Sequence, residues 1–79
     1  MGIRRKIALR RIESLVGEIE NHLSKIELHR QHESVNHWRA ELRALMGQVQ
    51  ELIPSLGQRT GSLWEQRLGE WKRRYEEAQ

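Results

Sequence analysis

Two runs of apolar residues recur along this chain at alternating intervals of three and four residues, the spacing of helices that bury one stripe against a partner. No stretch shows the period of two that is typical of a strand. The pattern therefore predicts an all-α fold with a coiled-coil-like packing seam. The first run is Leu9, Ile12, Val16, Ile19, Leu23 and Ile26, and the second is Val35, Trp38, Leu42, Leu45, Val49 and Leu52.

The second run is displaced by two residues from the heptad frame of the first. A continuous coiled coil absorbs insertions of three or four residues, and a slip of two fits neither. We therefore predict a turn between about residues 29 and 34, although residues 31–34 contain neither glycine nor proline. Ser34 or Asn36 is expected to cap the second helix. One long helix through this region is the alternative.

The second helix must end before Pro54, because proline disfavours helical geometry at the preceding Ile53. Residues 54–61 contain two glycines and predict a loop. Ser62 and Glu65 match a capping box that would start a third helix. That helix carries one largely aromatic stripe, formed by Trp64, Leu68, Trp71 and Tyr75.

These elements predict one small helical domain over residues 1–79, an antiparallel hairpin with a third helix packed against it as a three-helix bundle. Helix 1 is expected over about 3–30, helix 2 over about 35–53 and helix 3 over about 62–77. A core of this size supplies only about 3–5 kcal/mol. Because the heptads are regular enough to recruit a second copy, we expect a homodimer.

The basic charge is concentrated at the start of the chain. The sequence holds 14 Lys and Arg against 11 Glu, with no Asp, and has a net charge of +3. In the hairpin, helix 2 should end opposite about Ile12, so the first ten residues would overhang and expose Ile3, Ile7 and Leu9. The bases of this segment, with no acid among them, are Arg4, Arg5, Lys6, Arg10 and Arg11.

Such a segment indicates an anionic partner, which could be nucleic acid, a membrane surface or an acidic protein face. A solvated helix end is the alternative interpretation. A secondary basic and aromatic face formed by Arg67, Trp71 and Arg74 could stack single-stranded nucleic acid. The helical spacing of these aromatic residues favours a place in the core instead. Near the turn, we expect Glu27 to face Arg39, and Glu20 to lie on a solvated acidic flank.

The sequence gives no sign of catalysis. It has no Cys and no Asp, its serines fall in helical or capping contexts, and a chain this short has little room for a catalytic cleft. His29 and His32 could share a metal ion on one helix face, but no third ligand is apparent, so we expect neither metal nor cofactor. No apolar run approaches the ~18 residues of a membrane span, and no signal peptide is recognisable, so we expect a cytoplasmic location.

Two functional hypotheses remain. The first is a non-enzymatic protein–protein interaction or assembly module that self-associates through its heptad seams and uses residues 3–11 as its contact segment. The alternative is a small nucleic-acid-binding accessory protein that places the five N-terminal bases on phosphates.

Overall fold

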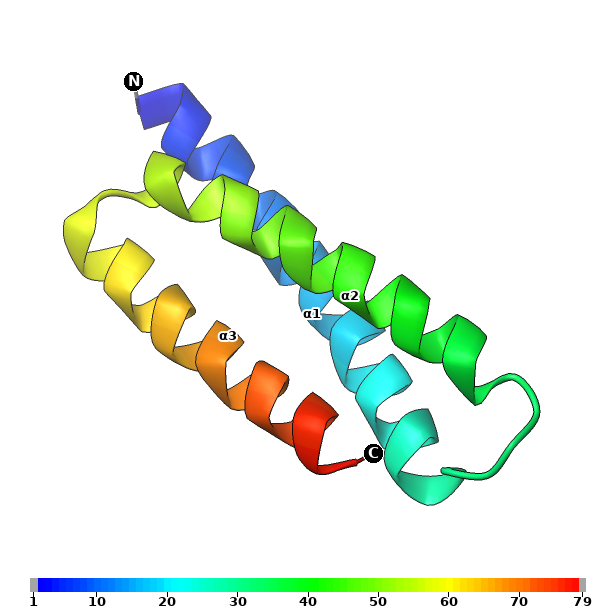
Figure 1. Cartoon of the computed structure of the whole chain (residues 1–79). Coiled ribbons are helices and arrows are strands. Elements are labelled where there is room, and N and C mark those ends of the chain that lie inside the picture. Colours follow the sequence, from blue (N-terminus) through cyan, green and yellow to red (C-terminus); the bar gives the residue numbers. More distant parts are fainter. Residues whose placement is uncertain (1, 79) are drawn as a thin grey trace.

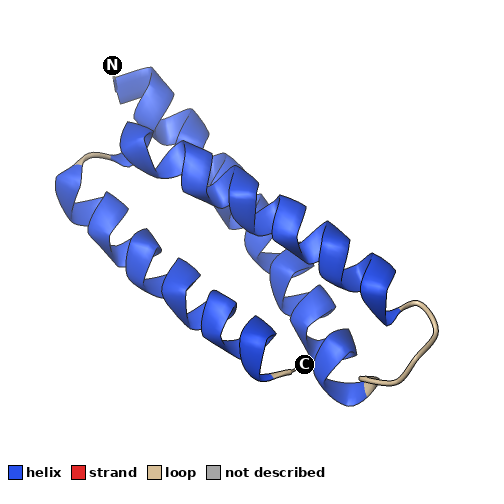
Figure 2. Cartoon of the chain, in the orientation of Figure 1, coloured by secondary structure: helices blue, strands red, loops and turns tan. Residues whose placement is uncertain are grey.

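A computed structural model of the chain describes residues 2–78, with side chains from Arg4 onward. It is the all-α three-helix bundle that the sequence predicts, and it contains no strand within the described residues (Figure 2). Helix α1 (Gly2–Leu28) and helix α2 (Val35–Leu52) form an antiparallel hairpin, and helix α3 (Gln58–Glu77) runs back beside it (Figure 1). The bundle is elongated, with extents of 45 × 17 × 15 Å.

The predicted turn between the first two helices is confirmed, and the alternative of one long helix is wrong. The turn satisfies its backbone groups without glycine or proline. The N–H of His32 donates to the carbonyl of His29 at 3.0 Å, and the N–H of Val35 donates to the carbonyl of His32 at 3.0 Å. Ser34 occupies the N-cap position of α2, but its side chain makes no capping hydrogen bond. Its N–H donates instead to His32 Nδ1 at 3.0 Å.

The predicted loop over residues 54–61 is wrong. The chain continues from α2 into a short 3₁₀ helix, η1 (Ile53–Leu56), with Pro54 in its first turn. Proline fits there because its missing N–H has no partner to lose. Gly57 then adopts a φ of +84°, a conformation that glycine tolerates far better than other residues, and the chain reverses there.

Helix α3 begins directly afterwards at Gln58, four residues earlier than predicted. The capping box at Ser62 is therefore wrong, since Ser62 lies exposed inside the helix. Gly61 is buried inside α3 because the helix approaches η1 closely at that point. A Cβ atom at Gly61 would lie 3.4 Å from the carbonyl oxygen of Ile53.

The core runs along the whole hairpin. In α1 the predicted seam residues Ile12, Ile19, Leu23 and Ile26 are fully buried, whereas Leu9 and Val16 are half-buried. Helices α2 and α3 both cover α1, so its buried stripe is wider than a two-helix seam and also includes Ala8 and Leu15. In α2 and η1 the fully enclosed or nearly enclosed residues are Leu42, Met46, Val49, Ile53 and Leu56.

The remaining predicted seam residues, Val35, Trp38, Leu45, Leu52 and Trp64, are half-buried and pack against this core. From α3, the core receives Leu68, Trp71 and Tyr75, as the core interpretation of the aromatic stripe predicts. Both heptad seams are thus packed inside a single chain.

Candidate interaction surface at the basic end of α1

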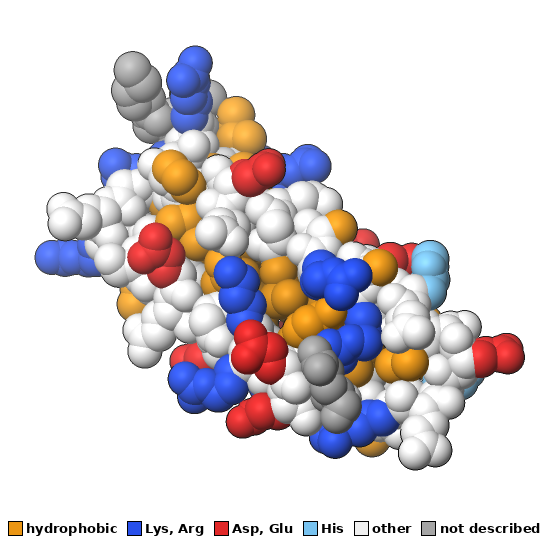
Figure 3. Space-filling view, in the orientation of Figure 1, with side chains coloured by type: hydrophobic (Ala, Val, Ile, Leu, Met, Phe, Trp, Pro, Cys, Tyr) orange, Lys and Arg blue, Asp and Glu red, His pale blue; other side chains and the backbone are white. Residues whose placement is uncertain are grey.

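The first three turns of α1 carry a concentration of uncompensated positive charge. Their five basic side chains are all exposed. Figure 1 shows the start of α1 projecting past the C-terminal end of α2, and several Lys and Arg side chains lie around this end on the face shown in Figure 3. Among side chains 4–78, no carboxylate lies within ion-pair distance of any of the five. We call Arg4, Arg5, Lys6, Arg10 and Arg11 the basic segment.

Ile7 lies within the basic segment and is 61% exposed, a high value for a large apolar side chain. The neighbouring Ala8 is buried and Leu9 is half-buried. The overhang is therefore shorter than predicted, because η1 reaches further along α1 than a helix ending at Leu52 would. The expected exposure of Ile3 concerns a side chain outside those that the structure describes, which begin at Arg4.

Arg5 differs from the other four bases. A Cβ atom at Gly57 would lie 2.9 Å from a terminal nitrogen of the Arg5 guanidinium. The Arg5 side chain therefore lies against the link between η1 and α3, on the inner side of α1. Arg4, Lys6, Arg10 and Arg11 remain directed to solvent.

The stacking face predicted at Arg67, Trp71 and Arg74 is wrong for Trp71, whose side chain is only 2% exposed. Its indole Nε1 donates to Glu20 Oε2 at 2.8 Å. The exposed Arg67 guanidinium lies 5.2 and 5.3 Å from the ring centroids of Trp64 and Trp71. The aromatic rings therefore serve packing and a surface cation–π contact rather than base stacking.

Arg74 joins α3 to α1. Its Nη1 donates to Glu20 Oε1 at 2.9 Å, and its Nη2 donates to Glu27 Oε1 at 2.9 Å. The expected Glu27–Arg39 pair and the solvated flank at Glu20 are therefore wrong. The sequence analysis did not predict this contact. Glu20 and Glu27 are seven residues apart, as are Arg67 and Arg74, and this matched spacing was the available signal.

On the side of α3 that faces α2, two other arginines hold Tyr75. The Arg39 guanidinium carbon lies 3.8 Å from the Tyr75 ring centroid, and Arg43 Nη1 donates to the Tyr75 hydroxyl at 2.7 Å. Arg39, Arg43 and Arg74 are thus engaged within the chain, in contrast to the basic segment.

The Arg74 contacts shift the pKa values of their partners. Burial opposes the ionisation of Glu20, but hydrogen bonds from Arg74 and Trp71 outweigh it and hold the pKa of Glu20 below its ordinary value of 4.5. The hydrogen bond from Arg74 likewise lowers the pKa of Glu27, and the two carboxylates raise the pKa of Arg74.

We expect Arg74→Met to destabilise the fold by about 1 kcal/mol at neutral pH, since water screens a partly exposed pair. A carboxyl group whose pKa is lowered by folding stabilises the fold above its unfolded pKa, and this contribution is lost as the pH falls through the folded pKa. The difference between wild type and variant should therefore shrink as the pH falls below 4.5. Thermal unfolding followed by circular dichroism at pH values from neutral to strongly acidic checks this, and a difference that is independent of pH would contradict it.

The histidines form two groups. Glu41 accepts contacts from two of them, with His22 Nε2 at 2.7 Å and His37 Nε2 at 2.6 Å. These contacts, the hydrogen bond from His22 foremost, lower the pKa of Glu41. His29 and His32 lie in the turn, where the ring of His32 stacks on Trp38 at 4.7 Å between centroids. Within the described part of the chain, no group of three His, Cys, Asp or Glu side chains could hold a metal ion.

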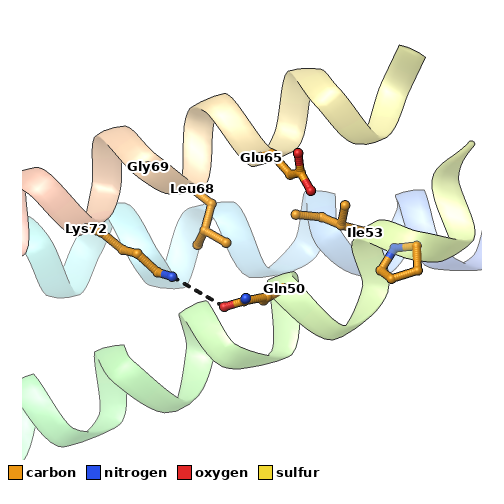
Figure 4. Close-up of a pocket in the computed structure, with 7 residues that line it drawn as sticks. Gln50, Ile53, Glu65, Leu68, Gly69 and Lys72 are labelled. Carbon is orange, nitrogen blue, oxygen red and sulfur yellow. Dashed lines mark hydrogen bonds between the residues drawn. The ribbon is translucent and has the colours of Figure 1, made fainter. Parts of the chain in front are cut away.

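A surface cleft of about 380 Å³ lies between the end of α2 and the middle of α3 (Figure 4). Lys72 Nζ donates across it to Gln50 Oε1 at 3.3 Å, while Ile53 and Leu68 form its apolar wall. The Lys72–Gln50 hydrogen bond thus bridges α3 and α2 across the cleft. In residues 2–78, every helix is too short or too polar to cross a bilayer.

The fold and surface together define a three-helix bundle with one strongly basic end. No protein-family model matches the chain, and neither a curated protein nor a solved structure shows significant similarity to it.

Proposed function

We propose that this chain is a non-enzymatic helical interaction module that meets an anionic partner through the N-terminal turns of α1. The observation that carries the proposal is the set of five exposed bases without a carboxylate partner among the described side chains. Uncompensated charge of one sign attracts a partner of the opposite sign over distances of about 10 Å.

The contrast with three arginines of α2 and α3 supports this role. Arg39, Arg43 and Arg74 hold Tyr75 or the carboxylates of α1 within the chain. The basic segment makes no comparable contact apart from Arg5 against Gly57. A contact surface for another molecule accounts for this concentration of unpaired charge, and such a contact would also cover the exposed Ile7.

Nucleic-acid binding is the second candidate. The same Lys and Arg side chains favour it, because cations that no carboxylate neutralises can contact phosphates. Self-association remains a prediction. The heptad seams pack inside one chain, so a homodimer would have to use other surfaces, such as the exposed Leu63 on α3. The molar mass from light scattering at several protein concentrations tests it.

To test the interaction module, all five bases of the segment are changed to Gln. We expect the wild-type protein to bind at least one polyanion among duplex DNA, polyglutamate and phosphatidylserine vesicles at low salt. The variant should bind at least tenfold more weakly, with unchanged helicity, because each contact removed takes a favourable charge interaction with it. Fluorescence anisotropy measures the duplex and the peptide, and co-sedimentation measures the vesicles. Absence of wild-type binding to all three would refute the proposal.

A further inference from the structure

We infer that the basic segment lies in the major groove of duplex nucleic acid. Ile7 is directed toward the edges of the base pairs, and the basic side chains on its two flanks reach the two phosphate backbones. This inference rests on the proposed function and names the partner. Arg5, which lies against Gly57, takes no direct part in it.

Basic side chains lie on both sides of Ile7 around α1, which is an unbroken helix over Gly2–Leu28. Successive residues of an α-helix are turned by roughly 100° about its axis. Relative to Ile7, Lys6 and Arg10 therefore lie roughly 60–100° to one side, and Arg4 and Arg11 roughly 40–60° to the other. Two bases thus flank the exposed isoleucine on each side.

This face points away from the bundle. Ile12 and Ile19, which are fully buried beneath the other helices, lie roughly 120–140° from Ile7 around the helix axis. Helices α2 and α3 cover that opposite side (Figure 1). The outward face of the first three turns is therefore free to enter a groove without displacing any part of the core.

The dimensions and chemistry of a major groove match this face. The groove is about 12 Å wide and admits an α-helix, whose diameter with side chains is about 10–12 Å. A phosphate backbone borders the groove on each side, so the basic side chains on each flank of the helix can contact one backbone. At the floor of the groove, apolar side chains such as Ile7 can contact the methyl group of thymine.

A flat anionic surface matches less well. A helix that lies on a membrane buries a face with several bulky apolar residues, whereas Ile7 is the one large apolar residue on this face between positions 4 and 18, with Ile3 one turn before it. Ser14 and Glu18 continue the same face along α1. The carboxylate at Glu18 would also oppose a long contact with lipid headgroups, and it limits the contact to the first three turns.

The test compares the two flanks. Binding of a labelled duplex of mixed sequence is measured by fluorescence anisotropy at about 50 and about 200 mM salt. One variant carries Arg4→Gln and Arg11→Gln, and a second carries Lys6→Gln and Arg10→Gln. The matched control carries Arg30→Gln and Arg73→Gln, which remove the same charge from exposed positions away from the segment. Circular dichroism verifies that all four proteins are folded.

Four phosphate contacts predict a fall in wild-type affinity of roughly 100-fold between the two salt concentrations, and two contacts predict roughly 10-fold. We expect both flank variants to show the smaller fall and to bind more weakly than wild type at low salt, and the control to behave like wild type. An effect confined to one flank, or an equal effect in the control, would overturn the groove arrangement.

The other polyanions separate this inference from the proposed function. Tighter binding of polyglutamate or phosphatidylserine vesicles than of the duplex would overturn the groove inference and leave the interaction module standing. Tighter binding of single-stranded than of duplex DNA would also overturn it, because a single strand has no groove. A failure to bind any of these anions would remove both.

Discussion

Replacing Ile19 with aspartate is expected to unfold this protein. Ile19 is 0% exposed and lies about two-thirds of the way along α1, where the side chains of the core enclose it. An unpaired carboxylate at this position costs several kcal/mol, which is comparable to the whole stability of about 3–5 kcal/mol expected of a core this small. The far-ultraviolet circular dichroism of the variant should lose most of its helical signal at 25 °C.

The matched control is Ile7→Asp, which makes the same chemical change on the same helix at a side chain that is 61% exposed. It should keep the helicity and melting temperature of the wild type. Native-like helicity and an unchanged melting temperature in Ile19→Asp would show that the core assignment of α1 is wrong.

Truncating Trp71 to alanine is expected to give the second largest effect, a loss of about 3–5 kcal/mol. Trp71 is the largest of the fully buried side chains, and its indole N–H donates to Glu20 of α1. The truncation therefore leaves a large cavity between α3 and the hairpin and also removes a hydrogen bond. Because this loss is comparable to the whole expected stability of about 3–5 kcal/mol, the variant should be largely unfolded at 25 °C, and chemical denaturation followed by circular dichroism measures how much stability remains.

Two variants separate these contributions. Trp71→Phe keeps most of the apolar volume and loses the hydrogen bond to Glu20, so it should be destabilised far less than Trp71→Ala. Leu63→Ala removes an exposed apolar side chain from the same helix and should change the free energy of unfolding by less than about 0.5 kcal/mol. Equal effects of Trp71→Ala and Leu63→Ala would contradict the docking of α3 through its aromatic stripe.

The three helices could be predicted from apolar spacing because each helix must bury a stripe that repeats every three or four residues. The turn at residues 29–34 could be predicted from the phase slip for the same reason. The start of α3 could not, because Pro54 and Gly57 are compatible both with a loop and with a 3₁₀ helix followed by a sharp reversal. The close packing of Gly61 against Ile53 belongs to the second arrangement, and it depends on residues from two different elements.

The basic segment of the candidate site was also visible in the sequence, since its charges are local and lie on one helix. The partners of Arg74 were not predicted, because Glu20 and Glu27 become neighbours of α3 only when α3 packs on one particular side of the hairpin. This placement of α3 also buries Trp71 and so removes the stacking face that the neighbouring arginines suggested.

The sequence alone determined the helical class, the hairpin and the basic end of α1, because these follow from periodicities and charges within single helices. The tertiary structure decided which side of α1 receives α3, which arginines are paired, and which face of the basic segment stays open. Those outcomes depend on the relative rotation and placement of packed helices, which the spacing within any one helix does not specify.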